Sequence, residues 1–258
     1  MVRTLRTARA GLPHEIMPCL HCTIVVPSCA DAYRRSIPPS RPVLNASMAT
    51  FHSTCRRSRT DPIELDAGES PVEQLPNETL VFLLGSRYCE TDKLADIAWR
   101  HFGSSPRGWR RVQAICDFVC DHLTFGYNYA RATRTAFEAY QERVGVCRDF
   151  AHLAVAFCRC VNIPARYANG FLGDIGVPPD PAPMDYNAWF EAFLDGRWFT
   201  FDARHNTPRI GRIMVARGRD ATDIPLVTSF GPHILKTFRV WTDEVDAAAL
   251  QDLNRRSA

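Results

Sequence analysis

The side chain best placed for chemistry in this sequence is the thiol of Cys147. It opens a segment, 148–161, in which apolar residues recur at helical spacing. A cysteine at a helix N-terminus meets the positive end of the helix dipole and unpaired backbone N–H groups, which lower the thiol pKa and favour the nucleophilic thiolate. The same N–H groups can receive the oxyanion of a tetrahedral intermediate. Position alone leaves a second interpretation open, in which Cys147 is a small buried thiol at a tight turn.

A predicted hairpin places two polar residues on one face of a sheet. Its turn is Asp195-Gly196, a sequence typical of two-residue type I′ turns, and this turn fixes the strand register. Asn187 then lies on the same face as Asp202, as a diagonal neighbour about 7–8 Å away between backbones. A carboxylate aimed at the neighbouring strand is how the base of a Cys-His-Asp triad is oriented. Taken singly, Asn187 and Asp202 also fit ordinary polar strand residues.

Four ordered blocks of sequence resemble the bacterial transglutaminase-like family, over roughly residues 70–245. They read GVCRDFAH (145–152), NIPARY (162–167), MDYNAWFE (184–191) and WFTFDARHN (198–206). The resemblance implies a papain-like α+β fold in which Cys147, the residue at position 187 and Asp202 form the catalytic triad. It also implies attack of the thiol on a carboxamide or peptide carbonyl, with transfer of the acyl group to water or to an amine.

The departure from the family lies at the base. Asn187 stands where the family has histidine, and an amide nitrogen cannot take the thiol proton. His152 lies five residues beyond Cys147, about 140° around the helix, and is expected to face away. His205 follows Asp202 by an odd number of residues and is expected on the opposite face if the strand continues. We interpret both histidines as structural.

These residues support two hypotheses. The first is a thiol acyl-transfer domain with catalytic residues Cys147, Asn187 and Asp202, impaired because Asn187 replaces the triad histidine. The alternative is a non-catalytic pseudoenzyme that uses the cleft to bind a peptide or protein. Either way we expect a peptide or protein partner, and no metal or organic cofactor.

The surrounding pattern is a helical cluster followed by an antiparallel sheet, hence an α+β prediction. Helical spacing covers 77–84, 91–103, 106–123, 135–143 and 148–161, with Asn77 and Thr91 as candidate caps. Strand patterns cover 165–172, 188–194, 197–202, 213–216, 226–230 and 238–241.

The first 60 residues differ in kind, with nine Arg against two acids and no sustained periodicity. We predict a disordered basic tail over 1–60, or a mis-assigned start upstream of Met48, and a transglutaminase-like domain over 61–258. A secretory signal fits poorly, and Pro38, Pro39 and Pro42 break the amphipathic helix of a transit peptide.

The composition excludes several classes. The Cys19-x-x-Cys22 pair has zinc-knuckle spacing but no second pair, so no metal site is predicted. The six cysteines beyond residue 60 sit mostly among apolar residues as free thiols do, which favours a reducing, cytoplasmic location. No apolar run approaches the ~18 residues of a membrane span, and no basic face suggests nucleic-acid binding.

Overall fold

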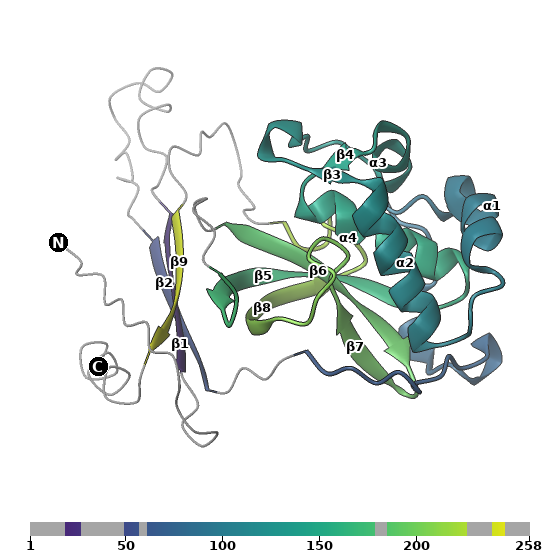
Figure 1. Ribbon diagram of the computed structural model, residues 1–258, viewed down its shortest axis with the longest axis horizontal. Coiled ribbons are helices and arrows are strands. Elements are labelled where there is room, and N and C mark those ends of the chain that lie inside the picture. The colour runs from purple at the N-terminus through teal and green to yellow at the C-terminus, as the bar shows by residue number, and fades with distance from the viewer. Residues whose placement is uncertain (1–18, 27–48, 57–60, 179–184, 226–238, 246–258) are drawn as a thin grey trace, which may run out of the picture.

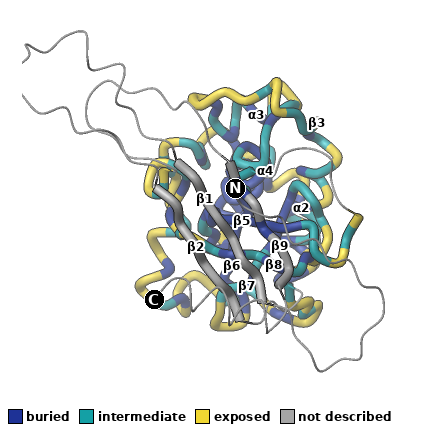
Figure 2. Tube along the Cα trace, turned by 90° about the vertical axis from the view of Figure 1, so that its left-hand side faces the viewer, coloured by how far each residue is buried: buried dark blue, intermediate teal, exposed yellow. Residues whose placement is uncertain are grey.

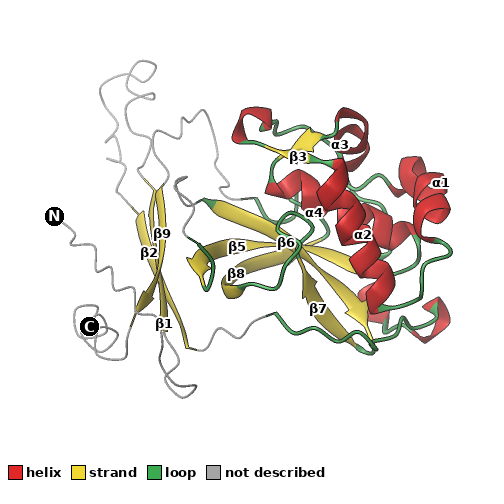
Figure 3. Cartoon of the chain, in the orientation of Figure 1, coloured by secondary structure: helices red, strands yellow, loops and turns green. Residues whose placement is uncertain are grey.

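The computed structural model describes residues 19–26, 49–56, 61–178, 185–225 and 239–245. Its helices lie on one side of a twisted antiparallel sheet (Figures 1 and 3), so the α+β prediction is confirmed. The helices are α1 (Thr91–Phe102), α2 (Trp109–His122), α3 (Ala136–Glu142) and α4 (Cys147–Cys160). Short 3-10 turns cover Val72–Gln74, Asn77–Phe82 and Tyr127–Tyr129, and β3 (Thr124–Phe125) pairs in parallel with β4 (Val144–Gly145).

The main sheet has four antiparallel strands in the order β7-β6-β5-β8. Their bounds are β5 (Ala165–Ile175), β6 (Tyr186–Leu194), β7 (Arg197–Phe201) and β8 (Ile210–Gly218). The turn between β6 and β7 has φ of 48° at Asp195 and 76° at Gly196, the positive values that a type I′ turn requires. Leu194 faces Arg197, so the predicted hairpin register is confirmed.

Helix α4 forms the centre of the core. It is buried from Asp149 to Cys160, and it packs against β6, β5 and the other three helices. Figure 2 shows the buried residues of the chain in dark blue. A helix that is apolar on nearly all sides is stable only when enclosed in this way. Each large side chain such as Phe150 or Phe157 contributes roughly 1.5–3 kcal/mol through burial. The position of Cys147 at the first residue of α4 is therefore set by the core itself.

Two predicted helix caps are wrong in detail. Asn77 and Thr91 are the first residues of their helices, so the N-cap positions belong to Pro76 and Glu90. Neither of these two residues makes a side-chain capping bond. The segment from Asn77 is a 3-10 helix, as its many exposed apolar side chains allow. The predicted strand 226–230 lies outside the described residues.

Two segments of the predicted tail are strands. β1 (Cys19–Val26) pairs antiparallel with both β2 (Ala49–Arg56) and β9 (Arg239–Val245), in the order β2-β1-β9. This differs from the expectation of a tail without strands. β9 also packs on β5, where Gly173 lies against Thr242. The boundary at residue 61 stays a prediction.

Gly170 fixes the close approach of strands at the position opposite Asn187. A Cβ there would lie 2.0 Å from the Ile213 carbonyl oxygen and 3.0 Å from the Trp189 ring. We expect Gly170→Ala to lower the free energy of unfolding by about 1–3 kcal/mol, the usual cost of overpacking. Gly68→Ala is the control, since a Cβ at Gly68 meets nothing within 4 Å. Urea denaturation of both variants checks this, and equal midpoints would contradict it.

Candidate active site

The start of α4 is held by a buried carboxylate. Asp149 accepts hydrogen bonds from the Val146 N–H, from Arg134 and from Arg148, each at 3.0 Å. Gly145 allows this contact, because a Cβ there would meet the Asp149 side chain at 2.7 Å. Since removing one member of a buried ion pair costs several kcal/mol, this cluster fixes the turn that carries Cys147.

Cys147 lies beside the open edge of β6. Strand β7 ends at Phe201, opposite Phe190, so the first residues of β6 extend beyond it. The Cys147 Sγ lies 3.8 Å from the Tyr186 carbonyl oxygen, to which an S–H group donates. The Ala188 N–H also interacts with the sulfur. The backbone on both sides of Asn187 therefore holds the thiol.

Burial and the surrounding charges have opposite effects on the pKa of the Cys147 thiol. Burial raises its pKa to about 11, against the opposing effects of the Arg204 guanidinium and the Ala188 N–H. This effect of burial opposes the lowering of the thiol pKa that the sequence predicts for a cysteine at a helix N-terminus.

Asn187 is oriented by an arginine. Its Nδ2 donates to the Asp185 carbonyl at 3.1 Å, and its Oδ1 accepts from the Arg204 guanidinium at 3.3 Å. The Arg204 guanidinium also lies over the Phe125 ring, 3.6 Å from the centroid. The amide thus positions a cation near the sulfur, where the family has a base.

Asp202 is a buried charge with four hydrogen bonds. Its Oδ1 accepts the backbone N–H groups of Arg204 and His205 at 3.0 and 3.1 Å. Its Oδ2 accepts from the His205 Nδ1 at 2.9 Å and from Arg212 at 2.8 Å. Burial alone would raise the pKa of this carboxyl, but the His205 hydrogen bond and the Arg212 charge hold it well below its usual range.

The two histidines have different outcomes. His205 contacts Asp202, so its predicted place on the opposite face is wrong. The strand ends at Phe201 and the chain turns, bringing His205 back to the carboxylate. His152 is structural, as predicted: burial lowers its pKa to about 3, its Nε2 accepts the Ala221 N–H at 3.1 Å, and its ring stacks on Tyr88.

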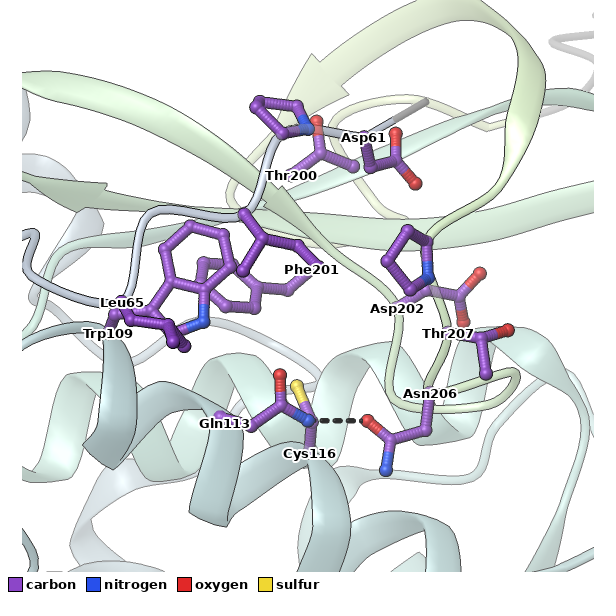
Figure 4. A pocket seen from close by; sticks show the side chains of 13 residues that line it. Asp61, Leu65, Trp109, Gln113, Cys116, Thr200, Phe201, Asp202, Asn206 and Thr207 are labelled. Atoms are coloured by element: carbon purple, nitrogen blue, oxygen red, sulfur yellow. Dashed lines mark hydrogen bonds between the residues drawn. The ribbon is translucent and has the colours of Figure 1, made fainter. Parts of the chain in front are cut away.

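The predicted site residues line two cavities. Cys147 and Asn187 line one of about 640 Å³, and Asp202 lines another of about 260 Å³. Figure 4 shows the second, where Gln113 and Asn206 are hydrogen-bonded below Trp109. The structure thus brings Cys147 and Asn187 together, while Arg204 connects Asn187 to Asp202.

Sequence reasoning missed the arginines of this site. Arg204 and Arg212 both follow Asp202 closely, and a buried carboxylate requires such partners. That requirement was the available signal. The need for a partner does not indicate which arginine contacts the carboxylate and which contacts Asn187.

A thiol at the start of a core helix, beside the edge of an antiparallel sheet, defines a papain-like site. Residues 98–203, which include Cys147, Asn187 and Asp202, match the family model of the transglutaminase-like superfamily. Residues 98–203 of this chain thus form a transglutaminase-like domain.

Two known proteins are similar to this chain. The uncharacterized protein ML0607 of Mycobacterium leprae is 32% identical over 207 residues, which is 79% of this chain and 66% of that protein. The chain thus spans just under two thirds of that relative. A solved structure of a candidate cysteine protease from Cytophaga hutchinsonii has 24% identity and a TM-score of 0.70, covering 91% of this chain and 92% of that one. This likeness shows the papain-like fold.

Asp202→Asn tests the role of the carboxylate in stability. The ionised carboxylate stabilises the folded state at pH values above about 3.9, the pKa of Asp in the unfolded chain. This stabilisation is lost as the pH falls toward the lower pKa of the folded state. We expect the variant to be less stable by roughly 3 kcal/mol at pH 7, because Arg212 loses one of its two carboxylates. The difference should shrink below about pH 4.

Urea denaturation from pH 3 to pH 7 measures this difference. The control is Asp66→Asn at an exposed position. A penalty for Asp202→Asn that stays constant with pH would contradict the assignment of the charge to Asp202.

Proposed function

We propose that this chain is a thiol acyl-transfer domain whose catalysis at Cys147 is severely impaired, and whose cleft binds a peptide or protein segment. The observation that carries the proposal is the pairing of Asn187 with Arg204, next to a protonated thiol. Among the described residues, no imidazole nitrogen is hydrogen-bonded to Cys147. The acyl group, if formed, would pass from a carboxamide or peptide carbonyl to sulfur and then to water or an amine.

Two effects reduce the rate. A thiol with a pKa of about 11 is present as thiolate in only about one molecule in ten thousand at pH 7. General-base catalysis by an oriented imidazole is worth on the order of 10²- to 10⁴-fold, and Asn187 cannot supply it. An oxyanion would be bound by N–H groups at the start of α4, where those of Asp149 and Phe150 already donate to the Val146 carbonyl. The site therefore keeps transition-state donors and lacks proton transfer.

The second candidate is a pure binding module, and the contacts of Asn187 and Asp202 favour it. Asn187 has partners for both ends of its amide, and Asp202 has four. A site that lacked its base and was otherwise unchanged would contain a buried polar group without a partner, which lowers the free energy of unfolding. The cavity of about 640 Å³ fits a peptide segment and is walled by tyrosines. We propose a reducing compartment such as the cytoplasm, since the six cysteines beyond residue 60 are free thiols.

No helix among the described residues is long and apolar enough to cross a membrane. In the same part of the chain, no group of three or more His, Cys, Asp or Glu is arranged to hold a metal ion.

Asn187→His tests the impairment directly. An imidazole at position 187 would lie beside Cys147 and near Asp202. The rate of hydroxamate formation from a blocked glutaminyl-glycine dipeptide and hydroxylamine should therefore rise by about 10²-fold or more. The gain should vanish in the double variant Asn187→His, Cys147→Ala, because members of a catalytic unit act together.

Asn187→Gln is the matched control. It keeps an amide and adds no base, so we expect no gain. If the unmodified chain already turns over the dipeptide at a rate that Asn187→His leaves unchanged, another base has taken over and the impairment is refuted.

A further inference from the structure

An unpaired acceptor lies in the wall of the Cys147 cavity. Asn169 is only 2% exposed and lines this cavity. Its Nδ2 donates to the Ile224 carbonyl at 2.9 Å, whereas its Oδ1 has no hydrogen-bond partner among the residues that the structure describes. A buried carbonyl oxygen without a partner costs about 1–3 kcal/mol and calls for an explanation.

The orientation of the amide is fixed by its neighbour. Exchanging the oxygen and nitrogen of Asn169 would bring two carbonyl oxygens together at Ile224, because the backbone oxygen can only accept. The unpaired atom is therefore the oxygen, and a group that satisfies it must donate.

The sheet register places this oxygen on the side of the nucleophile. Asn169 in β5 faces Ala188 in β6, and paired residues project from the same face. Ala188 packs in a small apolar cluster with Tyr167 and Cys147, and its N–H interacts with the sulfur. Asn169 and Cys147 thus belong to one wall of one cavity.

A bulge lies next to Asn169. Asn169 is paired with Ala216 of β8, whereas the next residue, Gly170, is paired with Met214. Val215 is the extra residue and is half exposed. Such bulges redirect neighbouring side chains and recur beside active sites.

We propose that Asn169 is the specificity-determining residue of this cavity, accepting a hydrogen bond from an amide N–H of the bound peptide segment. This rests on the proposed function, because it assumes that the cavity receives such a segment. The free protein already carries the cost of the unpaired oxygen, so a ligand N–H recovers it on binding. A carboxylate or an ester oxygen at this place would be repelled, so the cavity selects amides over acids and esters.

Two small amides probe the acceptor. N-methylacetamide has one N–H group. N,N-dimethylacetamide has the same acetamide group but no N–H. Each is titrated into the ¹⁵N-labelled full-length chain, and the Ala188 backbone and Asn169 side-chain amide signals are followed by NMR. We expect N-methylacetamide to bind about 3- to 10-fold more tightly, the value of one hydrogen bond.

Variants of Asn169 assign the preference to its oxygen. In Asn169→Leu the affinity ratio of the two amides should fall to about one. Asn169→Gln keeps an amide oxygen as acceptor together with an amide N–H donor and should retain the preference, which guards against a Leu variant that fails to fold. Asn206→Ala is the control, because the Oδ1 of Asn206 already has Gln113 as a partner in the other cavity.

The outcomes separate this inference from the proposed function. If both amides shift the Ala188 signal with equal affinity, the cavity binds amides and the role of Asn169 is refuted. If neither amide shifts it, the proposed binding role of the cavity fails together with the inference.

Discussion

The site depends on one constraint, the need to satisfy the buried charge of Asp202. A carboxylate removed from water requires donors, and it takes the two backbone N–H groups of the following turn together with His205 and Arg212. These bonds end β7 at Phe201 and fold the next residues back toward β6. The same turn sends Arg204 to Asn187 and leaves the first residues of β6 open to Cys147.

The pairing of Asn187 with Arg204 then decides the chemistry of the thiol. A neutral amide oxygen holds a guanidinium near the sulfur, and that charge opposes the effect of burial without cancelling it. The pKa of the thiol is raised to about 11, and a cavity of about 640 Å³ lies beside it. In the function proposed above, the loss of one proton acceptor turns a reacting site into a binding site.

Much of this arrangement is predictable from sequence. The position of Cys147 at a helix start and the pairing of Leu194 with Arg197 follow from helical spacing and from a turn that fixes register. The contact of His205 with Asp202 does not, because it depends on where β7 ends. The thiol pKa also required the structure, since helix position argues for a lowered value and only burial reverses it. β1 pairs with β2 and β9, which lie far from it in the chain, so no pattern within β1 indicates its partners.

The central claim is that Cys147 has no base and remains a thiol. The most direct measurement is the rate of alkylation of Cys147 in the unmodified chain by iodoacetamide, resolved by peptide mass spectrometry, as a function of pH. Because only the thiolate reacts, the rate constant should rise about tenfold per pH unit from pH 7 to pH 10 and level off only near a pKa of about 11. A plateau already reached below about pH 8 would show a thiolate stabilised by a paired base and would contradict the account.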